Sequence, residues 1–262
     1  MGQITKDNWK EADLNVDSLW IIEERDKKGK HANVYHGNFI PQIPNQLIRR
    51  YTEEKETVLE LFSGSGTTLF ECEQLGRNYI GFDINKQIIK YVENKMKGCE
   101  DIKYALCDCD VTNPEMFCEM ANAACKEQGI EKVDFLIAHP PYLDIVKFTQ
   151  DKRDLSQITN VNVFLDKLVQ AMRNGLGYLK EGHYFAIVAG DIYKQGEVVP
   201  LAFYIMNAII QNFKVKMKGI VVKNIEGNRG KLGVQDVWQF RALQSDFFLF
   251  KHEYIFVFKK MA

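Results

Sequence analysis

A short apolar segment that ends in two consecutive prolines is the part of this chain best suited to chemistry. Residues 133–138 form a largely apolar run, and His139-Pro140-Pro141-Tyr142 follows directly. Because proline lacks a backbone N–H and has a fixed φ, the chain cannot continue there as a central strand. In open α/β sheets, ligands bind at the carboxyl ends of strands. A polar side chain, a free proline carbonyl and an aromatic face at that edge suit a planar group that carries an exocyclic amine.

A glycine-containing turn is the second chemical feature. Residues 62–67 read Phe-Ser-Gly-Ser-Gly-Thr and lie between an expected strand and an expected helix. Glycines allow a tight turn and a close approach of the backbone to a ligand. The helix N-terminus adds N–H donors and positive potential. The segment lacks the Gly-Lys-Ser/Thr of a Walker loop, and Leu69 stands where a dinucleotide fingerprint has its third glycine.

Three acidic residues follow or precede these turns. Asp83 and Asp108 end two successive expected strands, and Glu60 stands just before the glycine turn. A carboxylate at 83 can accept both ribose hydroxyls of a nucleoside, and one at 108 can accept an adenine amino group. Each could equally serve as a helix cap or turn residue. Glu60 could face an ammonium group. Adenosine together with an ammonium group indicates S-adenosylmethionine rather than a nicotinamide dinucleotide.

Alternating strand and helix patterns must position these residues, and this alternation is typical of a parallel sheet. The last two strands have no helix between them, which predicts an antiparallel pair. We therefore predict an α/β fold with a seven-stranded, mostly parallel sheet and an antiparallel C-terminal strand pair. The expected strands are 57–61, 78–82, 102–107, 133–138, 184–189, 214–222 and 254–258; the expected helices begin with a short one capped by Asn45 and continue with 67–75, 85–97, 113–128, 161–179 and 198–212.

Composition restricts the class of protein. The chain has 262 residues, 46% of them hydrophobic, and a formal net charge of −1, which is ordinary for a globular protein. No apolar run is long enough to span a bilayer and no signal segment is visible, so we expect a cytoplasmic protein that does not bind membranes. The six cysteines form no C-x-x-C pair. We expect reduced thiols and no metal site. Residues 1–32 are predicted to be a polar extension with little core of its own, and residues 33–262 a single domain.

Two longer segments carry a family resemblance. Residues 58–69, Val-Leu-Glu-Leu-Phe-Ser-Gly-Ser-Gly-Thr-Thr-Leu, and residues 75–85, Leu-Gly-Arg-Asn-Tyr-Ile-Gly-Phe-Asp-Ile-Asn, closely resemble the N4-cytosine/N6-adenine DNA methyltransferases. Residues 139–142 resemble that family's (Asp/Asn/Ser)-Pro-Pro-(Tyr/Phe/Trp) motif, and residues 252–260 resemble its closing strand. The resemblance covers roughly 35–262. It implies a Rossmann-like class I methyltransferase fold.

The resemblance also implies a reaction and roles for residues. The reaction is site-specific transfer of a methyl group from S-adenosylmethionine to adenine N6 or cytosine N4 of a flipped base in double-stranded DNA. The segment 39–41 would close over the cofactor, and the Tyr142 ring would stack on the base. The catalytic residues would be His139, Pro140, Pro141 and Tyr142, and the cofactor-binding residues Phe39, Ile40, Pro41, Glu60, Phe62, Ser63, Gly64, Gly66, Thr67, Asp83, Ile84 and Asp108.

One position departs from the family pattern. The first motif residue is His139, where the family has Asp, Asn or Ser. A neutral imidazole can accept one hydrogen bond, but a protonated one would repel a developing cation. We therefore expect activity to fall as pH drops through the His139 pKa, and a flat profile from pH 5.5 to 8 would count against this. The alternative is a histidine that only shapes a binding pocket. No Pro-Cys pair follows the strand, which removes the covalent route to carbon-5 methylation of cytosine.

Basic residues outside the motifs are the candidates for DNA contact. In the long connection 224–252 and just before it we select Lys223, Asn224, Arg229, Lys231, Trp238 and Arg241; Lys147, Lys152 and Arg153 follow the motif. Phosphate contacts of this kind position a duplex without reading its sequence. Because no separate recognition domain is evident, sequence specificity would come from these loops, from a second copy in a homodimer or from a partner specificity subunit. The alternatives are an RNA or protein amide methyltransferase, or a non-catalytic cofactor- or DNA-binding subunit of a modification or defence complex.

Overall fold

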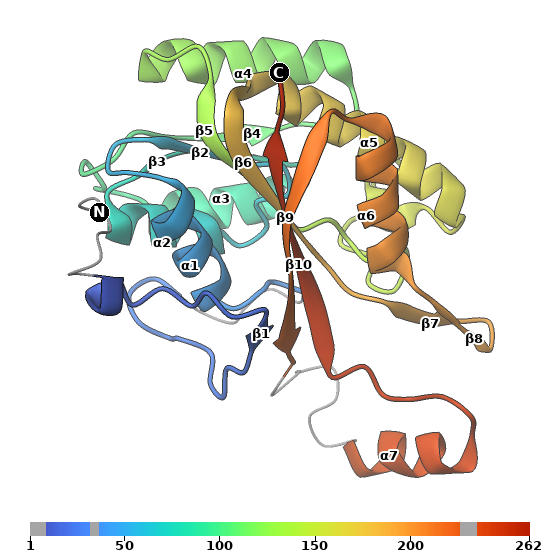
Figure 1. Cartoon of the computed structure of the whole chain (residues 1–262). Helices are drawn as coiled ribbons and strands as arrows, with labels where there is room; N and C mark the ends of the chain where they lie inside the picture. Colours follow the sequence, from blue (N-terminus) through green and yellow to red (C-terminus); the bar gives the residue numbers. More distant parts are fainter. Residues whose placement is uncertain (1–8, 32–36, 226–234) are drawn as a thin grey trace.

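An eight-stranded β-sheet with helices on both faces forms the centre of the protein (Figure 1). The structure is a computed structural model that describes residues 9–31, 37–225 and 235–262. The sheet order is β1-β9-β10-β6-β5-β2-β3-β4. Its strands are β1 (Leu19–Trp20), β2 (Thr57–Glu60), β3 (Asn78–Asp83), β4 (Tyr104–Asp108), β5 (Val133–Ala138), β6 (Leu179–Ala189), β9 (Val215–Asn224) and β10 (His252–Lys260).

The strand directions confirm the predicted fold class. Strands β2 to β6 pair in parallel. Strand β10 runs antiparallel to both β6 and β9. The chain passes from β2 to β3 on one side, whereas β5 lies on the other side of β2. The strand order therefore reverses between β2 and β5, and ligands bind at such a switch point in open α/β sheets.

The helices form two layers because consecutive residues of a central strand point to opposite faces. Val58 joins the apolar cluster under one layer, and Leu59 joins the cluster under the other. The first layer contains α1 (Gln42–Tyr51), α2 (Thr67–Leu75) and α3 (Lys86–Lys95); the second contains α4 (Pro114–Gln128), α5 (Val161–Tyr178) and α6 (Leu201–Asn212). Each cluster is buried, so the sheet holds the loops at its carboxyl edge on a rigid support.

Strand β1 is the main departure from the predicted fold. It pairs in parallel with β9 and raises the strand count from seven to eight. Its Trp20 is 4% exposed and packs in the first layer's core. The segment expected to have little core therefore contributes to the sheet. Two residues are too few to produce a recognisable alternation in sequence.

Other boundaries differ at loops. Helix α1 begins at Gln42 after Pro41, not after Asn45. A hairpin of β7 (Ile192–Lys194) and β8 (Glu197–Val199) occupies the expected start of α6. Helix α7 (Gln235–Gln244) lies in the expected long loop, and short 3₁₀ turns span Trp9–Glu11 and Leu155–Gln157. Figure 1 shows the hairpin and α7 extending beyond the sheet. Within the described ranges, no helix is long and apolar enough to cross a membrane.

Candidate functional site

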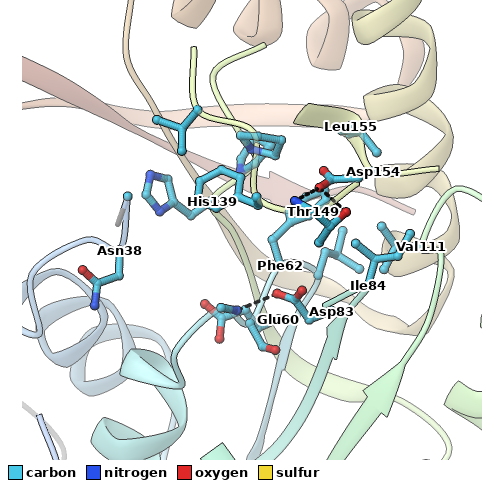
Figure 2. Close-up of a pocket in the computed structure, with 18 of the residues that line it drawn as sticks. Asn38, Glu60, Phe62, Asp83, Ile84, Val111, His139, Thr149, Asp154 and Leu155 are labelled. Atoms are coloured by element: carbon cyan, nitrogen blue, oxygen red, sulfur yellow. Dashed lines mark hydrogen bonds between the residues drawn. The ribbon is translucent and has the colours of Figure 1, made fainter. Parts of the chain in front are cut away.

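A cleft opens at the switch point between β2 and β5 (Figure 2). Its empty space, with the open mouth included, is about 1070 Å³. Residues that follow four parallel strands line it, and two further segments close around it. The lining comprises Glu60 to Ser65 and Thr67 after β2, Asp83 and Ile84 after β3, Cys109 to Val111 after β4, His139 to Tyr142 after β5, and residues from 37–39 and 145–155.

Asp83 ties the glycine turn to strand β3. Its Oδ2 accepts the Gly64 N–H at 2.8 Å, and its Oδ1 accepts the Asn85 N–H at 2.8 Å. The cap of α3 is Asn85, whose side chain accepts from two backbone N–H groups of that helix. Burial raises the pKa of Asp83 to about 6, against the backbone N–H bonds that lower it. The carboxyl is thus not a helix cap. It lines the cleft while it fixes the loop beside it (Figure 2).

Gly66 serves the packing of the loop rather than the lining of the cleft. Its φ of +80° is a left-handed conformation that suits glycine. A Cβ there would lie 2.7 Å from Cγ1 of Val92 in α3. Gly64 and Ser63 do line the cleft, but Gly66 does not. Gly66 was predicted to contact the cofactor. It acts on the cleft only indirectly, because its lack of a side chain lets α2 begin close to α3.

Glu60 is a buried acid at the end of β2. Its Oε1 accepts the Thr68 hydroxyl at 2.7 Å, and its Oε2 accepts the Tyr79 hydroxyl at 2.6 Å. Burial raises the pKa of Glu60 to about 8, although both hydroxyls lower it. The protonated form therefore predominates at neutral pH in the free protein. A cation bound in the cleft would favour the ionised form.

The four motif residues line the cleft as well. Figure 2 shows His139 on the side of the cleft opposite Asp83 and Glu60. The His139 ring lies between the rings of Phe39, at 4.9 Å between centroids, and Tyr142, at 5.5 Å. Burial lowers the pKa of His139 to about 4. His139 is therefore neutral from pH 5.5 to 8. With this pKa, the fall in activity that we expect on protonation of His139 would lie near pH 4, below the range of pH 5.5 to 8.

The Tyr142 ring packs closely against the backbone at Gly190, which fixes its position. A Cβ at Gly190, directly after β6, would approach the Tyr142 Cε2 atom to 2.9 Å. The hydroxyl end of the ring reaches Glu253 of β10, because the Tyr142 hydroxyl donates to Glu253 Oε2 at 3.3 Å. Burial raises the pKa of the Tyr142 phenol, and the Glu253 charge adds to this.

Some expected cofactor residues do not line the cleft. Ile40 and Pro41 lie outside it, although Phe39 lines it. Asp108 also lies outside, and its Oδ2 pairs with Lys86 Nζ at 2.9 Å. Asp110, two residues further along, lines the cleft in its place. Strand β4 ends at Asp108, and the chain lines the cleft only from the next residue, Cys109, onward.

Two of the expected DNA contacts are engaged inside the protein. Lys223 is buried and pairs with Glu253 Oε1 at 3.2 Å. The Asn224 side chain bonds both the N–H and the carbonyl of Ile22, which holds β1 beside β9. Neither residue is available to phosphate. Arg229 and Lys231 lie outside the described residues, and so does the Trp238 side chain; Arg241 is exposed on α7, and Lys147, Lys152 and Arg153 are exposed after the motif.

Several lining residues were not singled out from sequence. They include Asn38, Asp110 and the segment 145–155. Within that segment, Asp154 accepts bonds from the Thr149 N–H and hydroxyl, which folds the chain back over the cleft. Closely spaced Asp, Ser and Thr residues are the sequence signal of such a turn. Glu253, which bonds the Tyr142 hydroxyl, was also not singled out, although it lies in the segment 252–260.

Comparisons with known proteins connect this site to one family. A sequence model of the family described as DNA methylase matches residues 2–94, the part that contains the glycine turn and Asp83. The type II methyltransferase M.MjaII of Methanocaldococcus jannaschii is 38% identical over 73 residues, which are 28% of this chain and 14% of that protein. M.MjaI of the same organism is 39% identical over 96 residues, 32% of each chain. These matches support the resemblance of this chain to the N4-cytosine/N6-adenine DNA methyltransferases.

The matches to these relatives are partial. The chain spans a third or less of the length of either methyltransferase, and the motif at 139–142 lies outside the segment matched by the family model. Among solved structures, TrmN from Thermus thermophilus has a TM-score of 0.51 at 13% identity, over 89% of this chain and 50% of that chain. This likeness confirms the Rossmann-like methyltransferase fold.

Likeness to this methyltransferase family supports S-adenosylmethionine as the cofactor. The residues of the cleft fit such a ligand. Ser63 Oγ is buried, lines the cleft and has no hydrogen-bond partner among the described residues. A buried polar atom without a partner is costly, so a ligand that bonds it would be favoured. Asp83 and Glu60 add carboxyl groups at the same side of the cleft.

Proposed function

We propose that this protein transfers a methyl group from S-adenosylmethionine to an exocyclic amine of a base in double-stranded DNA, at adenine N6 or cytosine N4. One observation carries the proposal. The proline motif and the glycine turn, which are 73 residues apart from Gly66 to His139, line a single cleft with Asp83. A methyl donor and an amine must meet at one place for transfer, and this cleft offers a side for each.

The donor side would be formed by Asp83, Ser63 and Glu60. The Asp83 carboxylate would accept ribose hydroxyls, Ser63 would bond a polar atom, and Glu60 would face the ammonium group. When bound, S-adenosylmethionine supplies an electrophilic methyl carbon on a positively charged sulfur. Because Glu60 is protonated in the free protein, its ionisation on binding would add a charge pair inside a buried site.

The acceptor side would be formed by the motif. An exocyclic base amine is a poor nucleophile because its lone pair is delocalised into the ring. The Pro140 carbonyl and a His139 ring nitrogen would each accept one N–H of the amine, which frees the lone pair for attack. The Tyr142 ring would stack on the base, which must leave the duplex to enter the cleft. Acceptors that fit the developing ammonium better than the starting amine accelerate the reaction.

His139 would also receive the proton that the amine loses. A conjugated amine that is being alkylated becomes far more acidic than an imidazolium, so even a ring of low basicity can take its proton. The lowered pKa of His139 ensures that the ring is neutral beforehand and leaves its proton to solvent afterwards. This role fits the departure from Asp, Asn or Ser at the first motif position.

DNA would be held by exposed basic residues outside the cleft. Lys147 and Lys152 follow the motif and are exposed, and Arg241 is exposed on α7. Such residues would position the duplex through its phosphates. Recognition of a specific sequence would need more surface than these provide. A second copy of the chain or a partner specificity subunit would supply it.

The test is a transfer assay with methyl-labelled S-adenosylmethionine and three acceptors: duplex DNA, RNA and protein. The proposal predicts label in DNA alone, loss of transfer in Tyr142→Ala, and unchanged cofactor affinity in that variant. Label in RNA or protein would instead support an amide or RNA methyltransferase. Tight cofactor binding with no transfer to any acceptor would support a non-catalytic subunit, and either result would reject the proposal.

A further inference from the structure

A chain of hydrogen-bonded polar groups runs from the motif to the C-terminal strands. His139 Nε2 lies 3.1 Å from the Tyr142 hydroxyl oxygen, and that hydroxyl donates to Glu253 Oε2 at 3.3 Å. The other carboxylate oxygen, Oε1, accepts from Lys223 Nζ at 3.2 Å. Glu253 and Lys223 are directly opposite each other on β10 and β9. They are 7% and 4% exposed.

Burial of the Lys223–Glu253 charge pair costs free energy, so we look for a role of the pair beyond stability. Removing two charges from water costs several kcal/mol per ion, and their attraction offsets this only in part. A pair of well-packed apolar residues would serve the sheet as well. Through Tyr142 the pair is connected to His139, the motif residue that departs from the family pattern, which indicates a role in the site rather than in stability.

The direction of each hydrogen bond follows from what each group can do. A carboxylate only accepts, so the Tyr142 hydroxyl must give its single proton to Glu253. The Tyr142 oxygen is then left as an acceptor toward His139. The His139 Nε2 must therefore carry the ring proton. In the neutral ring the lone pair is then on Nδ1, for which the described residues provide no hydrogen-bond partner.

We propose that Glu253, paired with Lys223, is a positioning residue that fixes the tautomer of His139 through Tyr142, so that Nδ1 is the acceptor presented to the reacting amine. This inference deepens the proposed function and its catalytic part rests on it. Without the carboxylate, the Tyr142 hydroxyl could point its proton at His139, and Nε2 would become the acceptor while Nδ1 carried the proton. The ring would then present a donor where the amine needs an acceptor.

The groups that face His139 determine how it titrates. On its own segment the neighbour is the Tyr142 hydroxyl, and on the first helical layer it is the uncharged Phe39 ring. From β10, Glu253 raises the pKa of His139, and from β9, Lys223 lowers it; burial exceeds both and brings it to about 4. Removal of either charge should therefore shift the titration in a known direction.

The test combines imidazole ¹⁵N spectra of the full chain with steady-state kinetics. The unaltered protein should show a protonated Nε2 and a bare Nδ1 on His139 at pH 7. Glu253→Gln should give a mixture of tautomers, since its amide can donate to or accept from Tyr142. It should also lower the His139 pKa, whereas Lys223→Met should raise it. A purely structural role would not move these signals in opposite directions.

Activity provides the second readout. Glu253→Gln should lower kcat at least about tenfold with unchanged cofactor affinity, because a carboxylate that sets a histidine tautomer contributes up to about 10⁴-fold in a catalytic triad. Glu181→Gln, the same change at an exposed position in β6, is the matched control and should behave as the unaltered protein. If Glu253→Gln does not fold, Tyr142→Phe breaks the same chain and should also give mixed tautomers.

The outcomes separate this inference from the proposed function. A protonated Nδ1 in the unaltered protein, or a tautomer that Glu253→Gln and Tyr142→Phe leave unchanged, overturns the inference whatever the activity. An unchanged kcat in Glu253→Gln, in a protein that methylates DNA, overturns its catalytic part. The expected spectra in a protein that never methylates DNA would uphold the tautomer control and reject the proposed function alone.

Discussion

Replacement of Glu60 by Gln should change how the stability of this protein depends on pH. Glu60 is 2% exposed and bonds the hydroxyls of Thr68 and Tyr79. Its pKa rises from 4.5 to about 8 on folding, so the folded protein holds a proton that the unfolded chain releases. Its contribution to stability is therefore complete below pH 4.5 and is lost as pH rises toward 8. Gln has the shape of the protonated acid, keeps one acceptor and one donor, and does not titrate.

The size of the effect follows from the shift. Each pH unit inside the window removes about 1.4 kcal/mol from the unaltered protein. Between pH 5 and pH 7 the Glu60→Gln variant should gain up to about 3 kcal/mol relative to it. The assay is urea unfolding of both proteins at half-unit steps from pH 5 to 8. Titrating groups that do not interact with Glu60 cancel in the difference between the two proteins, whereas Asp83, whose charge raises the pKa of Glu60, contributes to it. A difference that stays constant over this range would refute the assignment of a raised pKa to Glu60.

The same residue links stability to ligand binding. If S-adenosylmethionine presents its ammonium group to Glu60, binding should release a proton near pH 7. Calorimetry in two buffers of different ionisation enthalpy measures that release. Glu60→Gln should bind without it. Equal proton release in both proteins would show that Glu60 does not meet the cation.

Three further predictions concern other parts of the site and fold. Gly190→Ala should lower kcat/KM for DNA at least about tenfold and leave cofactor affinity unchanged, because the new methyl group displaces the Tyr142 ring; equal activity would show that the ring position is not needed. Asp83→Ala should weaken cofactor binding by about 10- to 100-fold, and the affinity of the unaltered protein should fall below about pH 6, measured by titration calorimetry. Trp20→Ala should lower the free energy of unfolding, measured with urea, by about 3–5 kcal/mol, whereas Leu19→Ala at an exposed position should lower it by under about 0.5 kcal/mol. Similar losses in the two variants would show that Trp20 does not pack in the core.

The part of the fold that could be predicted from sequence is the part where local pattern and burial agree. Strand 133–138 is buried along its whole length because helices cover both sides of the sheet, and the prolines that follow it fix where it ends. The predicted α2 has the same bounds in the structure because Gly66 and Gly76 adopt left-handed conformations at its two ends. Strand β1 could not be predicted, since its two residues owe their conformation to pairing with β9.

The site was predicted where a residue's role depends on its own loop, and missed where it depends on a neighbour. Asp83 is the last residue of β3 and lines the cleft. Asp108 instead pairs with Lys86, and Asp110 lines the cleft. Lys223 carries the positive charge expected of a residue that contacts phosphate. Its position opposite Glu253, however, is a property of strand register that sequence does not reveal.

The identity of the methylated nucleoside tests the central claim most directly. Duplex DNA is incubated with the protein and S-adenosylmethionine, digested to nucleosides and analysed by mass spectrometry. The account predicts N6-methyladenine or N4-methylcytosine, and neither product when Tyr142 is replaced by Ala. The finding of 5-methylcytosine, or of unmodified DNA beside a methylated RNA or protein, would contradict it.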